Sequence, residues 1–113
     1  MEFKFNECPD YTTIAIEGLF IGGEEANNLF DVVQEKIKNG TKKIIFDLEK
    51  VNYIGSMAIG ILIKINDSLT DTSGKIALCC MSQTILEVLK ITKVDLMLSI
   101  FDSKEKAINF LSE

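Results

Sequence analysis

The feature that most constrains the fold is a repeated change from short apolar β-forming runs to apolar residues at helical spacing. Two stretches carry apolar side chains at positions i, i+3, i+4, i+7 and i+11, which is one face of a helix. They are Ala26, Leu29, Phe30, Val33 and Ile37, and then Ala58, Ile61, Leu62, Ile65 and Leu69. A short apolar run, 44–48, lies between them and is typical of a strand in a sheet interior. Strands that alternate with helices are joined by right-handed crossovers, so the pattern predicts a parallel sheet.

The flanking segments extend this pattern in both directions. Residues 3–5 and 11–20 contain β-forming side chains on either side of the turn Cys8-Pro9-Asp10, which predicts an N-terminal β-hairpin. Residues 75–81 and 97–101 predict two further strands. A helix capped by Ser82 is expected between them, and a capping box of Asp102 with Glu105 predicts a final helix.

The predicted fold class is therefore α/β. We expect one domain over residues 1–113, with a mixed, mostly parallel sheet, an N-terminal β-hairpin and about four helices.

The charge balance limits the partners. The chain carries 12 Lys and Arg against 17 Asp and Glu, and it has no basic cluster, which argues against nucleic acid and anionic lipid as ligands. No apolar run approaches the roughly 18 residues of a membrane-spanning helix, and no signal peptide is visible. We therefore expect a cytoplasmic protein that binds other proteins and does not insert into a membrane.

The sequence offers little for catalysis or for a cofactor. Histidine is absent, and no base accompanies a candidate nucleophile, so we expect that the protein is not an enzyme. An odd cysteine count with the adjacent pair Cys79-Cys80 is a poor disulfide framework and a poor zinc site. In a strand the two side chains would point to opposite faces. We therefore expect buried reduced thiols and no metal or organic cofactor.

Ser56 is the first candidate for a regulatory residue. It lies where the strand-like segment gives way to helical spacing, across residues 52–58. The first N–H groups of a helix lack partners and the helix dipole is positive there, so the position favours an anionic group, including a phosphate on the serine itself. A plain N-cap role for Ser56 is compatible with this one. We expect its hydroxyl to be exposed at a helix N-terminus.

Apolar and small residues beside Ser56 are candidates for contact with a partner. Gly55 and Met57 flank the serine, and Ile59 and Ile63 form a second apolar stripe on the following helix. This stripe is either an exposed patch for a partner or additional core, and the sequence favours neither. Gly60 is expected to serve close helix packing.

Three segments together resemble the STAS domain, as found in bacterial anti-sigma factor antagonists. They are Gly18 with the Gly- and acid-rich helix start after it, the strand 44–48 leading into 51–56, and residues 86–93 before the last strand. The middle segment is the most specific of the three. The order of elements agrees with the family over essentially all 113 residues.

The resemblance implies a function. It implies that a partner anti-sigma factor, with a histidine-kinase-like ATPase fold, phosphorylates Ser56, and that the unphosphorylated protein binds this partner and frees a sigma factor. The alternative is a STAS subunit of another assembly, a lipid-transport complex or a stress-signalling particle, without serine control. The family's usual Asp before the serine is Gly55 here, Met57 and Ala58 replace its small polar residue and its Gly, and an early acidic residue is replaced by Ile21.

Overall fold

The strands and helices alternate as the sequence predicts. The computed structural model describes residues 1–113. Its elements are β1 (Glu2–Glu7), β2 (Thr12–Phe20), α1 (Gly23–Lys38), β3 (Lys43–Ile54), α2 (Ser56–Asp71), β4 (Lys75–Cys79), α3 (Gln83–Ile91), the 3-10 turn η1 (Val94–Leu96), β5 (Ser99–Phe101) and α4 (Lys104–Leu111). The α/β class and the four helices are confirmed. None of the helices has both the length and the apolar character needed to cross a membrane.

The five strands form one sheet in sequence order, β1-β2-β3-β4-β5. β1 and β2 are antiparallel, with Phe3 opposite Ile16, so the N-terminal hairpin is confirmed. The pairs β2–β3, β3–β4 and β4–β5 are all parallel. The sheet is therefore mixed at its N-terminal edge and parallel elsewhere.

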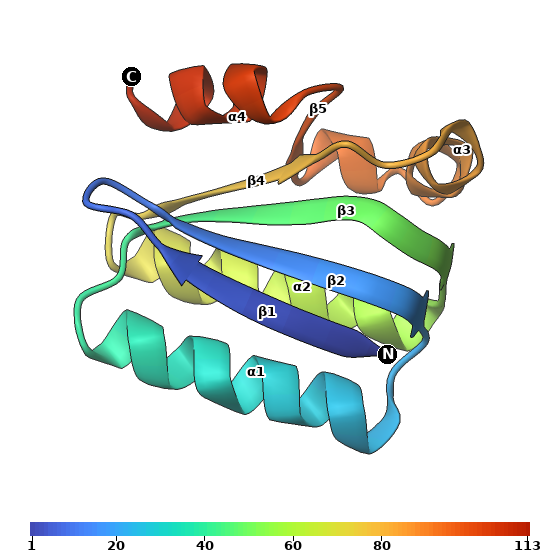
Figure 1. Ribbon diagram of the computed structural model, residues 1–113, viewed down its shortest axis with the longest axis horizontal. Helices are drawn as coiled ribbons and strands as arrows, with labels where there is room; N and C mark the ends of the chain where they lie inside the picture. Colours follow the sequence, from blue (N-terminus) through green and yellow to red (C-terminus); the bar gives the residue numbers. More distant parts are fainter.

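β3 is apolar because both of its faces are covered by helices. Figure 1 shows α1 and α2 below the sheet and α4 above it. Ile44, Phe46 and Leu48 belong to the larger buried core, to which α1 and α2 also contribute. Ile45 points the other way and joins a smaller buried cluster with Ala107 of α4. Alternation along one strand thus sends side chains into two cores.

Several element boundaries differ from the predicted ones. β3 continues beyond residue 48 to Ile54 because β2 pairs with it that far. β4 ends at Cys79, since Cys80 has a positive φ of 68°. The last strand is shortened to three residues because η1 occupies 94–96.

The predicted capping box at the last helix is wrong. Ser103 is the N-cap of α4 and accepts a hydrogen bond from the Lys106 backbone N–H, while Asp102 forms an ion pair with the Lys106 side chain. The cap predicted at Ser82 is confirmed, since its hydroxyl accepts from the Ile85 N–H.

The expectation that Gly60 serves close packing is not supported. A Cβ at Gly60 would meet no atom within 4 Å outside its own helix backbone, although the residue lies inside α2. A Cβ at Gly74 would overlap the carbonyl oxygen of Lys42. Only the second glycine is required by its surroundings.

We expect Gly60→Ala to raise the free energy of unfolding by about 0.5–1 kcal/mol, because alanine reduces the entropy lost on forming the helix. The matched variant Gly74→Ala is expected to lower it, since the new methyl group displaces backbone. Urea unfolding of both variants checks this. A lower free energy of unfolding for Gly60→Ala would contradict the inference that a methyl group at this position meets no neighbouring atom.

Candidate binding surface at the start of helix α2

Strands β2 and β3 end side by side, and α2 begins directly after them. Phe20 and Ile54 are paired as the last residues of the two strands, and both are buried. The Gly55 backbone N–H donates to the Phe20 carbonyl oxygen at 2.9 Å, which fixes the exit of β3. Ser56 is the first residue of α2 and is exposed, as expected from the sequence.

Gly55, rather than Ser56, is the N-cap of α2. Its backbone is extended, with φ −104° and ψ 168°, and its carbonyl oxygen accepts from the Ile59 N–H at 3.0 Å. No side chain caps this helix, whereas serine hydroxyls cap both α3 and α4. The N-cap interpretation of Ser56 is therefore wrong, and the hydroxyl is not committed to capping.

The positive end of α2 also lacks a compensating charge. The first turn of α1 contains Glu24 and Glu25, but the first turn of α2 contains no acidic residue. Helix dipoles favour negative charge at this end, by about 0.3–1 kcal/mol for an exposed group. An anion attached to Ser56 would be placed favourably.

Exposed apolar side chains lie on the segments next to Ser56. Leu19, Ile21, Tyr53 and Met57 are 54%, 50%, 55% and 65% exposed. Single exposed apolar residues are common, but several on adjoining segments indicate a binding surface. We call these four residues, with Gly55 and Ser56, the α2 patch.

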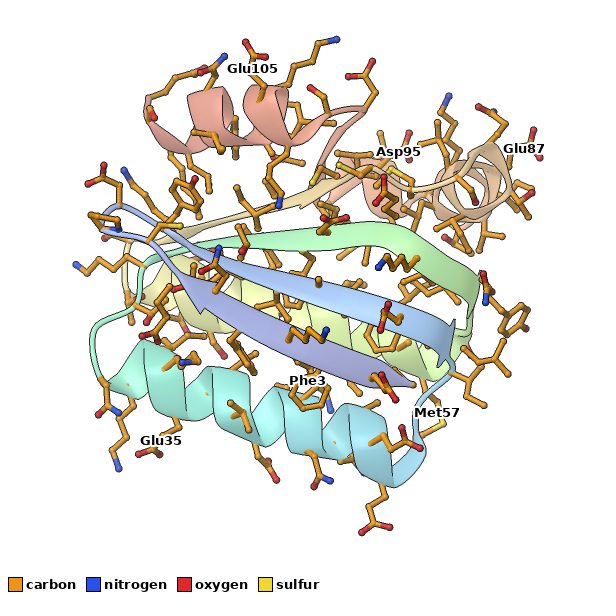
Figure 2. All side chains as sticks on the ribbon, viewed as in Figure 1. Phe3, Glu35, Met57, Glu87, Asp95 and Glu105 are labelled. Carbon is orange, nitrogen blue, oxygen red and sulfur yellow. The ribbon has the colours of Figure 1, made fainter.

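Backbone contacts hold the members of the α2 patch together. Leu19 pairs with Tyr53 across the two strands. A Cβ on Gly55 would lie 3.3 Å from the Cα of Ile21. A Cβ on Gly22 would lie 2.8 Å from the Cβ of Met57, so the turn between β2 and α1 touches the start of α2. Figure 2 labels Met57 at this end of the molecule.

The structure separates the predicted contact residues into two groups. Met57 and Ser56 are exposed and Gly55 is half-buried beside them. Ile59 is only 7% exposed and belongs to the larger core, and Ile63 is half-buried against it. Of the two interpretations of this stripe, the core one holds for Ile59.

Leu19 and Tyr53 are exposed residues that the local sequence pattern does not predict. Each precedes the buried last residue of its strand, Phe20 or Ile54. Strand alternation sends neighbouring side chains to opposite faces, so each lies on the face away from the core. Strand alternation could have predicted the exposure of Tyr53, but only if β3 were known to extend to Ile54.

The expectation that the Cys79 and Cys80 side chains point to opposite faces is also wrong. Cys80 lies outside β4, and the two Sγ atoms are 3.2 Å apart. A carboxylate oxygen of Asp47 lies near both sulfur atoms, and the three atoms are within 4.8 Å of one another. Burial raises the pKa of the Cys79 thiol, and its hydrogen bond with Cys80 adds to this.

Asp47 itself is held locally. One carboxylate oxygen accepts from the Glu49 N–H at 3.0 Å, and the other lies 3.6 Å from the Lys104 Nζ.

Comparisons with a family model and with known proteins agree on one family. The family model described as the STAS domain matches residues 7–107. A protein of Thermotoga neapolitana, named as a candidate anti-sigma factor antagonist and homologue of TM1081, is 30% identical over 77 residues, 68% of each chain.

Solved structures share the fold. The crystal structure of TM1081 from Thermotoga maritima, also named as a candidate anti-sigma factor antagonist, has a TM-score of 0.88 at 22% identity and covers 98% of this chain and 95% of its own. The antagonist SpoIIAA in its unphosphorylated form has a TM-score of 0.79 at 18% identity, covering 98% of each chain. SpoIIAA of Bacillus in its phosphorylated form has a TM-score of 0.66 at 16% identity, covering 96% of this chain and 97% of its own.

We expect Ser56→Ala to leave the free energy of unfolding within about 0.5 kcal/mol of wild type, because the hydroxyl caps no backbone group. Ser82→Ala is the matched control and is expected to cost about 1 kcal/mol, because it removes the cap of α3. Urea unfolding measures both. A loss at Ser56 as large as that at Ser82 would show that Ser56 has a structural role.

Proposed function

The chain belongs to the STAS domain family, and on this basis we propose that it acts as an anti-sigma factor antagonist. It binds an anti-sigma factor with a histidine-kinase-like ATPase fold through the α2 patch and thereby releases a sigma factor. The relative from Thermotoga neapolitana supports this assignment by its name. The main support for the proposal is the exposed start of α2, which no side chain caps, together with the exposed apolar side chains on the segments next to it.

The α2 patch has the chemistry of a protein-binding surface. Aromatic residues and methionine are enriched in interfaces, and they supply most of the binding energy when they enter pockets of the partner. Tyr53 and Met57 fill this role from two different elements, β3 and α2. Ile21 adds apolar surface where the family usually has an acidic residue. The partner surface is therefore expected to be apolar opposite Ile21 and Met57.

Phosphorylation of Ser56 would act as a switch. A phosphate adds about −1.5 to −2 charge at pH 7. In the free protein the start of α2 stabilises this charge, and neither Gly55 nor Ile21 places a carboxylate beside it. In the complex the same charge would be removed from water against an apolar surface, which is costly. The modification therefore leaves the fold intact and weakens binding.

The proposed activity is binding, and the protein is the substrate of its partner kinase rather than an enzyme. The absence of histidine from the chain fits this role. The proposal places the protein in the cytoplasm, where sigma factors act.

The switch is tested by the affinity for the cognate anti-sigma factor. We expect Ser56→Ala to bind as wild type does and Ser56→Asp to bind at least about tenfold more weakly, or about 1.4 kcal/mol. The matched control is Thr70→Asp, which adds the same charge at an exposed position of α2 about 20 Å away. It should bind as wild type does. Isothermal titration calorimetry gives all four affinities, and incubation with the partner and ATP gives phosphate incorporation.

Equal affinities for wild type, Ser56→Ala and Ser56→Asp, with no phosphate incorporated at Ser56, would contradict the switch. Binding that persists in that case would identify a STAS subunit without serine control. The absence of any binding would contradict the proposed partner as well.

A further inference from the structure

A second group of functional atoms lies away from the α2 patch. Asp47 of β3 is the register partner of Cys79 in β4, so their side chains leave neighbouring strands on the same face. With Cys80 they place two sulfur atoms and a carboxylate oxygen within 4.8 Å of one another. Nothing in the proposed binding role uses these atoms.

The fold brings the two adjacent cysteines together by ending β4 between them. Cys80 has φ 68°, in the left-handed region that non-glycine residues rarely occupy. This turn directs its side chain back to Cys79, so the Sγ atoms lie 3.2 Å apart. An extended Cys80 would have pointed to the other face.

The surroundings are apolar on one side and accessible on the other. Cys79 is fully buried in the smaller cluster with Ile45, Ala77, Ala107 and Leu111, beneath α4. Cys80 is half-buried, and the Asp47 side chain is 19% exposed. The three donor atoms are therefore enclosed by apolar side chains next to Cys79, and a small ion can reach them from the solvent next to Cys80 and Asp47.

We propose that Asp47, Cys79 and Cys80 form a zinc-binding site. Two thiolates and one carboxylate suit Zn²⁺, whereas Mg²⁺ and Ca²⁺ prefer oxygen donors only. As the two Zn–S bonds form, each thiol releases its proton to solvent. Three protein donors leave the fourth tetrahedral position to water.

The distances require a small adjustment. Two Zn–S bonds of about 2.3 Å at the tetrahedral angle place the sulfur atoms about 3.8 Å apart. The Sγ atoms must therefore separate by roughly half an ångström from 3.2 Å. Cys80 can supply this movement because it lies outside the sheet and is half-exposed.

Lys104 competes with the metal for Asp47. Its Nζ lies 3.6 Å from one carboxylate oxygen, and its side chain is 45% exposed, so it can turn into solvent. The Glu49 N–H holds the other oxygen and keeps the carboxylate oriented. Removing the lysine charge should therefore strengthen zinc binding.

The site is independent of the proposed partner surface. Asp47 precedes Ile54 by seven residues along β3, which is roughly 20 Å of strand. Failure of the zinc site would therefore leave the proposed antagonist function untouched, and the reverse also holds.

The test is a zinc titration of the reduced full-length protein in competition with a chromophoric chelator. We expect one Zn²⁺ per chain, at least about tenfold weaker binding for Cys80→Ser, and tighter binding for Lys104→Ala. Cys8→Ser is the matched control, since Cys8 is the third cysteine and lies outside the group, and it should bind as wild type does. Replacing zinc by Co²⁺ should give the thiolate charge-transfer absorption in wild type, with lower intensity per bound Co²⁺ in Cys80→Ser, because that variant keeps only the Cys79 thiolate.

Thermal unfolding followed by circular dichroism verifies that Cys80→Ser is folded, and Lys104→Ala tests the site with all three donors intact. Absence of stoichiometric binding would overturn the proposal. So would equal affinities for wild type, Cys80→Ser and Lys104→Ala, or a Cys79–Cys80 disulfide in place of a metal complex.

Discussion

The parallel pairing of β2 with β3 determines where the chain leaves the sheet and where α2 begins. β4 accompanies β3 only as far as Asp47, but β2 continues beside it to Ile54. The buried pair Phe20 and Ile54 closes this extension. The chain therefore leaves both strands at the same end of the sheet (Figure 1). As a result, the turn before α1 packs against the start of α2. The α2 patch is a consequence of this shared end.

The same strand organises both proposed sites. Its far end presents Ser56 through the Gly55 cap, and its middle presents Asp47 at the position where β4 stops. Each site thus lies where a strand loses a neighbour or ends, because side chains there are no longer enclosed by the sheet. The buried apolar side chains on both faces of β3 stabilise the fold. The exposed functional groups lie where its pairing with a neighbouring strand stops.

Local patterns in the sequence were sufficient for the helices and for the position of Ser56, because apolar spacing and the change of period are properties of neighbouring residues. They were insufficient where the outcome depends on a partner strand. The extension of β3 to Ile54 requires β2, and the exposure of Leu19 and Tyr53 follows only from that extension. The left-handed Cys80 is likewise invisible to pattern reasoning, because few non-glycine residues adopt that conformation. Residue preference favours Ser56 as the N-cap, yet Gly55 holds that position with its backbone alone.

The proposed function requires that the α2 patch binds the partner. Adding unlabelled anti-sigma factor to the ¹⁵N-labelled protein tests this through the changes in backbone amide NMR signals. The largest changes are expected at Ile21, Tyr53, Ser56 and Met57. Ile91, Leu96 and Met97, which are also more than half exposed but belong to α3 and the segment after it, should change little. Changes concentrated on those three residues, with the α2 patch unaffected, would contradict the proposed binding surface.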